Sequence, residues 1–234
     1  MDITLYILIG VAAFIIVSTL KIRLVKELFL NLAFDIPVYL ISLEEDYDRR
    51  DALFSIVTPN NVSSTNGRIL NKDELIKNGI VQNKDMKLGE YGCYMSHVNI
   101  LEKISLDKNN DVSLVLEDDA EFVASIVSER INEIIENFNK DWDVICLGYN
   151  YHEILEDSSD IVLSQEMKLK RIKYLHGTQG YLVNNKNAYK YKDLLPIIYP
   201  YDLALPKGLK TFILEPPVIQ LSKFGGKSNT QSIN

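Results

Sequence analysis

The chain has 234 residues and a formal net charge of −7, from 25 basic and 32 acidic side chains. We expect no nucleic acid partner, because phosphate backbones are bound by grouped lysines and arginines and the sequence has no such group. The two cysteines, Cys93 and Cys146, are too few for a disulfide framework or a cysteine-rich zinc site, but they leave a single bridge between them open.

The first segment is far more apolar than the rest. Residues 3–20 carry no charge over 18 positions, about the minimum length that crosses a bilayer core. We therefore predict a transmembrane anchor at residues 1–20. A cleaved signal peptide is the alternative, but signal peptides have basic residues before the apolar run, and the only charged side chain there is Asp2. Residues 21–34 are predicted to form a juxtamembrane helical stalk or, alternatively, a plain core helix.

The charges after the apolar segment predict its orientation. Lys21, Arg23 and Lys26 follow the run, so the positive-inside rule places the rest of this single-pass protein on the cytosolic side. One N-glycosylation triplet, at residues 61–63, could be modified only on the lumenal side, so a lumenal domain remains the alternative.

From residue 35 to residue 234 the pattern is that of one α/β domain. Short apolar runs rich in β-formers alternate with amphipathic helical stretches, which predicts a mostly parallel, Rossmann-like sheet flanked by helices. The strands are expected at residues 37–43, 113–119 and 143–148, and the helices at residues 48–57 and 125–138. Residues 58–68 are read as a loop, and the proline-rich chain from residue 196 as extended segments along the surface.

Three acids end the most apolar of these strands. Glu117, Asp118 and Asp119 would lie at the carboxyl edge of a parallel sheet, where ligands of such folds bind. Adjacent carboxylates suit Mg²⁺ or Mn²⁺, which take oxygen ligands, although acids at a strand end can also simply face water. The three histidines share no metal-ligand spacing, which argues against a zinc hydrolase, and no glycine-rich phosphate loop is present.

Several blocks of the sequence, in order, resemble glycosyltransferase family 25, the lipooligosaccharide and collagen galactosyltransferase-type enzymes. They are VYLISLEEDYDRRDAL, LGEYGCYMSHVNILEKI, VLEDDAEF and GTQGYLVNNKNAYK, followed by YPYDLAL. The resemblance covers about residues 37–228. It implies a GT-A fold, a UDP-hexose donor carrying galactose or glucose, and inverting transfer to a glycan, glycolipid or protein acceptor.

The same resemblance suggests roles on the donor side. Asp118 and Asp119 would bind the metal and the diphosphate, with Glu117 supporting them or touching the ribose. One of Arg49 and Arg50 would pair with the phosphates or fix the loop over the uracil, while solvated surface charge is the alternative for at least one of them.

Other donor-binding candidates come from three further blocks. Ser42 stands where the family usually has Asn. Ser96 is predicted to cap a helix whose first turn holds His97, and His97 would shape the donor pocket or pack in the surface. Gly177, like Gly180, would let the backbone approach a sugar; Tyr181 would stack on it or serve as a strand core residue.

Inverting transfer needs a base that takes the proton of the acceptor hydroxyl. Asp202, in a proline-rigidified turn late in the chain, is the catalytic candidate, and an ordinary turn aspartate is the alternative reading. Glu153 and Asp143 are weaker candidates for the base. Two other functions stay open: an inactive GT-A-like domain kept as a membrane-tethered structural or binding module, and a nucleotidyl- or phosphotransferase on the same scaffold.

Overall fold

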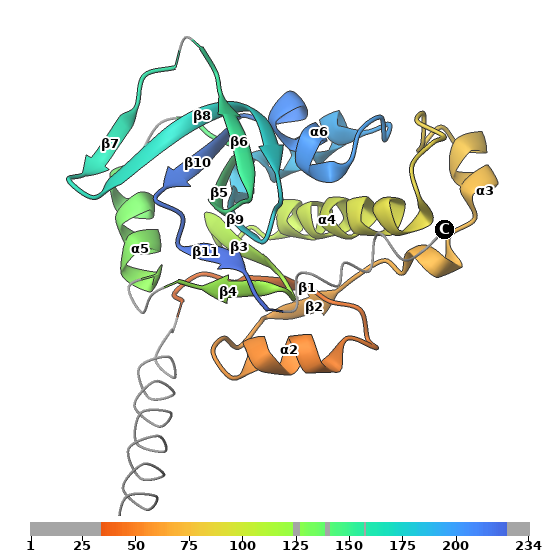
Figure 1. Cartoon of the computed structure of the whole chain (residues 1–234), viewed down its shortest axis with the longest axis horizontal. Coiled ribbons are helices and arrows are strands. Elements are labelled where there is room, and N and C mark those ends of the chain that lie inside the picture. Colours follow the sequence, from red (N-terminus) through yellow and green to blue (C-terminus); the bar gives the residue numbers. More distant parts are fainter. Residues whose placement is uncertain (1–33, 124–126, 139–140, 157, 224–234) are drawn as a thin grey trace, which may run out of the picture.

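The computed structural model describes residues 34–123, 127–138, 141–156 and 158–223 (Figure 1). The predicted anchor at residues 1–20 lies outside these ranges, as does the predicted stalk except for Phe34. Within the described ranges, no helix has both the length and the apolar character needed to cross a membrane.

The described elements alternate between strands and helices over most of the chain. In order they are β1 (Val38–Ile41), α2 (Tyr47–Phe54), β2 (Asn61–Ser63), η1 (Gly67–Ile69), α3 (Lys72–Lys77), α4 (Leu88–Leu106), β3 (Val112–Glu117), β4 (Ala120–Phe122), α5 (Val127–Asn137), β5 (Val144–Gly148), β6 (Tyr151–Ile154), β7 (Ile161–Ser164), β8 (Met167–His176), β9 (Gly180–Asn184), η2 (Asn185–Leu194), α6 (Tyr201–Gly208), β10 (Thr211–Glu215) and β11 (Ile219–Leu221).

Nine of the eleven described strands form one sheet with the order β2-β1-β3-β9-β5-β10-β8-β6, in which β7 also pairs with β8, while β4 and β11 pair as a separate two-stranded sheet. The pairs β2–β1, β1–β3 and β5–β10 are parallel, as the alternating pattern predicts. However, β9 is inserted antiparallel between β3 and β5, and β8 is antiparallel to β10. The direction of β9 was not predictable from its residues, because its first four are buried like those of a parallel strand.

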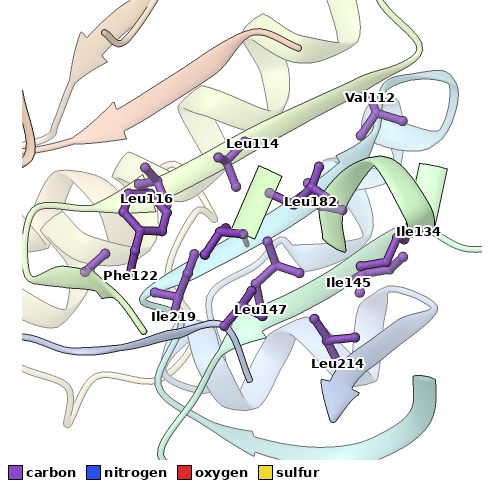
Figure 2. Packing of buried hydrophobic residues seen from close by; sticks show 14 of the residues in the cluster. Val112, Leu114, Leu116, Phe122, Ile134, Ile145, Leu147, Leu182, Leu214 and Ile219 are labelled. Atoms are coloured by element: carbon purple, nitrogen blue, oxygen red, sulfur yellow. The ribbon is translucent and has the colours of Figure 1, made fainter. Parts of the chain in front are cut away.

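Helices cover both faces of this sheet. On one face Leu116 of β3, Ile145 of β5 and Leu182 of β9 meet the inner sides of α2 and α5, and Figure 2 shows these side chains packed together. On the other face Val115 and Tyr181 pack against α4, η2 and α6. Successive residues of β3 thus enter opposite cores, which holds the strand rigidly up to its acidic end.

Three predictions about local structure are wrong. Residues 58–68 contain the edge strand β2 and the start of the turn η1. The chain after residue 196 forms the helix α6, and its strand-like run TFIL is a strand, β10, but one that is buried rather than on the surface. The third concerns α4, which begins at Leu88 and places Ser96 in its interior. The Glu90 carboxylate accepts a hydrogen bond from the backbone N–H of Lys87 at 2.7 Å and so starts the helix eight residues before the predicted cap.

Gly92 in α4 allows the helix to touch the backbone of η1. A Cβ atom built on Gly92 would lie 2.6 Å from the nitrogen of Gly67 and 2.8 Å from the carbonyl oxygen of Thr65. Backbone atoms cannot move aside as a flexible side chain can. The glycine is therefore needed here for space and not for conformational freedom.

We expect Gly92→Ala to lower the free energy of unfolding by about 2 to 3 kcal/mol, because overpacking against backbone costs this much. Urea unfolding followed by circular dichroism measures the change. Gly208→Ala is the matched control, since the closest atom to its added Cβ would be Cδ2 of the Leu194 side chain at 2.8 Å, and the nearest backbone atom would be the Asp193 oxygen at 3.1 Å. Equal losses in the two variants would contradict the close-contact explanation.

Candidate active site

The three acids lie at the carboxyl edge of the sheet, as predicted. Glu117 is the last residue of β3, and its backbone N–H donates to the carbonyl oxygen of Gln179 at 2.9 Å. The backbone N–H of Asp118 donates to the carbonyl oxygen of Ile41 at 3.1 Å, so the acids are fixed between the ends of β1 and β9. Asp119 then leads into β4.

Two cavities meet at these acids. The first holds about 100 Å³ of space for water-sized atoms, and the second about 580 Å³. Glu117 and Asp119 line both. The first is lined further by Ser42, Arg49, Thr65, Ser96 and Asp118, and the second by Asn150, His176, Thr178, Gln179 and Asp202.

Arg49 supplies a positive charge among the acids. Its Nε lies 3.1 Å from Asp118 Oδ1 and its Nη2 lies 2.9 Å from Asp119 Oδ2, and all three side chains are largely buried. The pKa of Asp118 is nevertheless raised to about 6, because burial outweighs the lowering effect of Arg49 and Ser42. Burial and the charge of Glu117 raise the pKa of Asp119 to about 7. A single guanidinium therefore does not fully compensate this pair of carboxylates.

The remaining acid, Glu117, has two neighbours from distant parts of the chain, Thr178 and His97. Thr178 donates its hydroxyl hydrogen to Glu117 Oε1 at 2.6 Å, and His97 Nε2 lies 3.5 Å from the same oxygen. Burial opposes ionisation of Glu117, but the nearby His97 ring and the hydrogen bond from Thr178 bring its pKa below the ordinary value. Glu117 is therefore a fixed anion on the floor of both cavities.

His97 itself is fully buried in α4. Its Nδ1 lies 2.8 Å from the hydroxyl of Tyr181, and its ring stacks on Tyr201 with centroids 3.9 Å apart. His97 thus connects β9 and the start of α6 to the acidic end of β3. It lies in the core behind the site, so the surface packing that was its alternative is wrong, and so is the predicted place in the first turn of a helix.

The chemistry of the acids suits a divalent cation that also binds a phosphate ligand. Asp119 Oδ1 is buried and has no hydrogen-bond partner among the described residues, which leaves one carboxylate oxygen available. No group of three or more potential ligands in the described part of the chain could hold a metal ion by itself. Since Mg²⁺ commonly takes one or two carboxylates and completes its shell with phosphates and water, Asp118 and Asp119 fit this kind of site.

The other predicted donor-side residues have different surroundings. Ser42 lies in the wall of the first cavity, as does Ser96, whose hydroxyl accepts from the backbone of Thr65 at 2.8 Å. Arg50 faces the carbonyl oxygen of Leu43 at 3.5 Å and is no partner of the acids.

Gly177 and Tyr181 flank the start of β9. Gly177 lines the second cavity with φ +85°, a left-handed conformation that favours glycine. Tyr181 is fully buried, so the structure gives it the core position that was its alternative reading, rather than a stacking surface.

Asp202 lies at the second position of α6 and lines the second cavity. Its Oδ1 accepts from the backbone N–H of Leu203 at 2.9 Å, and its Oδ2 accepts from that of Gly177 at 3.1 Å. The helix start and the loop before β9 together fix the carboxylate.

The two weaker base candidates lie in other places. Asp143 comes directly before β5, at the opposite edge of the sheet, where Lys190 Nζ lies 2.6 Å from its Oδ1. Glu153 of β6 pairs with Lys173 at 3.4 Å on an exposed surface. Both cysteines lie in the described residues and are free, so the bridge between them is not formed.

Sequence reasoning gave no role to Thr178, His176 or Tyr201, although each contacts a predicted site residue. Thr178 was inside the quoted block GTQGY, and Tyr201 directly precedes Asp202. Their contacts join residues 26 to 104 positions apart, and spacing along one sequence does not reveal them.

Comparison with known proteins identifies the family of this chain. Residues 35–205 match glycosyltransferase family 25, described as an LPS biosynthesis protein family. The procollagen galactosyltransferase 1-B of Xenopus laevis is 28% identical over 195 residues, which are 75% of this chain and 31% of that protein. A glycosyltransferase 25 family member of Aedes aegypti is 28% identical over 187 residues, 72% of this chain and 30% of that protein.

Another relative carries a different description. The probable inactive glycosyltransferase 25 family member 3 of Bos taurus is 25% identical over 194 residues, 75% of this chain and 32% of that protein. The chain spans about a third of the length of these curated relatives. Since the family match covers most of the described α/β domain, including the acids and Asp202, the chain belongs to glycosyltransferase family 25.

Proposed function

We propose that this domain transfers a hexose, galactose or glucose, from a UDP-sugar to a glycan, glycolipid or protein acceptor with inversion, with Mn²⁺ or Mg²⁺ as its cation. The observation that carries the proposal is the meeting of two cavities at a buried pair of carboxylates, next to an arginine. The proposal includes anchoring of the domain to a membrane by residues 3–20.

In the proposed complex the nucleoside lies in the first cavity and the diphosphate lies over Asp118 and Asp119. A cation held there would neutralise the diphosphate as it leaves. Arg49 forms a planar fork already directed at this position, and its guanidinium would pair with phosphate oxygens in place of the carboxylates. The raised pKa values of the two carboxyls support this, because burial raises them and the nearby Arg49 does not offset that effect.

The hexose and the acceptor would share the second cavity. Its volume of about 580 Å³ is in the usual range of small-molecule sites, whereas the first cavity is narrower. The acceptor oxygen attacks the anomeric carbon, its proton passes to a base at the Asp202 side of the cavity, and the bond to the UDP oxygen breaks. Glu117 and Asp119 line this cavity as well as the first, so they would lie between the sugar and the proposed place of the nucleotide.

The alternative is a domain without transferase activity that serves as a membrane-tethered structural or binding module. Two observations favour it: the small first cavity, and the relative described as probably inactive. It predicts that a UDP-sugar either fails to bind or binds without being cleaved.

A donor panel tests the proposal. We expect the full chain in detergent to bind UDP more tightly with Mn²⁺ than with a chelator, and to release UDP from UDP-galactose or UDP-glucose. Isothermal titration measures the first effect and a coupled UDP assay the second, with CMP-linked sugar as the control donor. Binding of the UDP-sugar without release of UDP would support the inactive alternative. The absence of both binding and release would refute the transferase proposal.

A further inference from the structure

His176 is a cavity residue for which the proposed function has no role so far. It is the last residue of β8, pairs with Tyr151 of β6, and accepts a backbone hydrogen bond from Asn150 at 2.8 Å. Its side chain is 49% exposed and lines the second cavity together with Glu117 and Asp119. The backbone is therefore fixed while the imidazole remains accessible to a ligand.

Both ring nitrogens of His176 have polar neighbours. Nδ1 lies 3.4 Å from Asp202 Oδ2, and Nε2 lies 2.7 Å from the hydroxyl of Tyr174. An ionised carboxylate can only accept, so the hydrogen of a neutral imidazole belongs on Nδ1, and Nε2 accepts from Tyr174. The Tyr174 ring also meets the imidazole edge to face, with centroids 5.0 Å apart, and helps to fix its plane.

Asp202 has the contacts of an orienting group. Backbone N–H groups of Gly177 and Leu203 donate to its two oxygens, and His176 Nδ1 approaches the oxygen shared with Gly177. A carboxylate held in this way fixes the tautomer of a neighbouring histidine and stabilises the imidazolium that forms. The distance of 3.4 Å is typical of catalytic contacts that shorten only when substrate is bound.

We propose that His176 is the general base of the transfer and that Asp202 is the positioning residue that orients it. This inference rests on the proposed function and changes the role of Asp202 within it. The acceptor hydroxyl replaces Tyr174 at Nε2. As its oxygen bonds to the anomeric carbon, its proton moves to Nε2, and the electron pair of the breaking bond stays on the UDP oxygen. The resulting imidazolium keeps its Nδ1 hydrogen directed at Asp202.

A plain surface cluster of histidine, tyrosine and aspartate is the competing explanation. The chain contains a matched example in His152, whose Nε2 lies 3.3 Å from Glu215 and whose ring meets Tyr149 edge to face at 5.0 Å. His152 is not among the described residues that line either cavity. It therefore serves as the control for a histidine with an acidic and an aromatic neighbour but no access to substrate.

The test uses the full chain with UDP-galactose and Mn²⁺, and with water as the acceptor. We expect His176→Gln to lower kcat for UDP release by about 10²- to 10⁴-fold, the usual contribution of a general base. The Kd for UDP, measured by titration, should stay within about twofold, because the imidazole acts on the acceptor proton and not on the nucleotide. His152→Gln should keep the wild-type kcat.

Chemical rescue separates a base from a structural residue. We expect added imidazole to restore UDP release in the His176→Gly variant. The same addition should not raise the rate of the Asp202→Asn variant, because that variant still carries the His176 side chain. Wild-type activity in His176→Gln, or a loss without rescue in His176→Gly, overturns the assignment but leaves the transferase proposal standing. A wild-type chain that neither binds nor cleaves UDP-galactose or UDP-glucose overturns both.

Discussion

An Asp119→Asn variant is expected to lose about a thousandfold of its UDP-hexose turnover while it remains folded. Asp119 lines both cavities, and its Oδ1 has no hydrogen-bond partner among the described residues. This oxygen is therefore the carboxylate atom best placed to bind a cation that the donor also binds. Loss of one group that stabilises developing charge in a buried site commonly costs 10²- to 10³-fold, and loss of the cation would add to that.

The measurement is UDP release at saturating Mn²⁺, together with a titration of Mn²⁺ in the presence of UDP. We expect the apparent Mn²⁺ affinity to fall along with the rate. Asp160→Asn is the matched control, because Asp160 forms only exposed ion pairs with Lys168 and Lys170. Full activity of Asp119→Asn with wild-type Mn²⁺ affinity would exclude the carboxylate as a cation ligand.

The second large effect is a loss of stability as pH rises in the cation-free domain. The pKa values of Asp118 and Asp119 are raised from 3.8 to about 6 and about 7. Between pH 4 and 7 the folded state therefore holds protons that the unfolded state has released. The contribution of these two carboxyls to the free energy of unfolding is therefore largest below pH 4, and it falls as the pH rises to about 7.

Since one unit of pKa corresponds to about 1.4 kcal/mol, and the two pKa values are raised by about 2 and about 3 units, the two carboxyls together should remove at most about 7 kcal/mol over this range. Thermal unfolding of the full chain in a chelator, from pH 5 to pH 8, measures the trend. We expect Mn²⁺ to raise the Tm at pH 8 and to have little effect at pH 5. The double variant Asp118→Asn/Asp119→Asn should show a flatter profile. An unchanged profile in that variant would assign the pH dependence to other groups.

The sequence was sufficient for the strands β1, β3 and β5 and for the location of the acids, but not for β9, which lies between β3 and β5. The strands β3 and β5 are buried on both faces, which requires mostly apolar residues, and β1 is an apolar run that alternates between buried and half-buried positions. An acidic triplet directly after such a run must emerge at the carboxyl edge. The predicted place of Glu117, Asp118 and Asp119 is accordingly confirmed.

Contacts across the fold were not predictable in the same way. The pairing of Arg49 with Asp118 joins positions far apart in the sequence, and nothing in the run DRRDAL distinguishes Arg49 from Arg50. The start of α4 was misplaced because Gly89 and Gly92 are unusual inside a helix. Here they are buried in the helix, and Gly92 lies against the backbone of η1. Tertiary close packing overrode local propensity at this position.

The shared oxygen of Glu117 has a consequence for protein engineering. Thr178 and His97 both reach Oε1 of this carboxylate, and they come from the loop before β9 and from α4. Substitutions at these two positions will not combine additively, because each changes the environment in which the other acts. A designer who wishes to move this acidic edge to another scaffold must transplant α4, β3 and the loop of residues 177–179 as one unit.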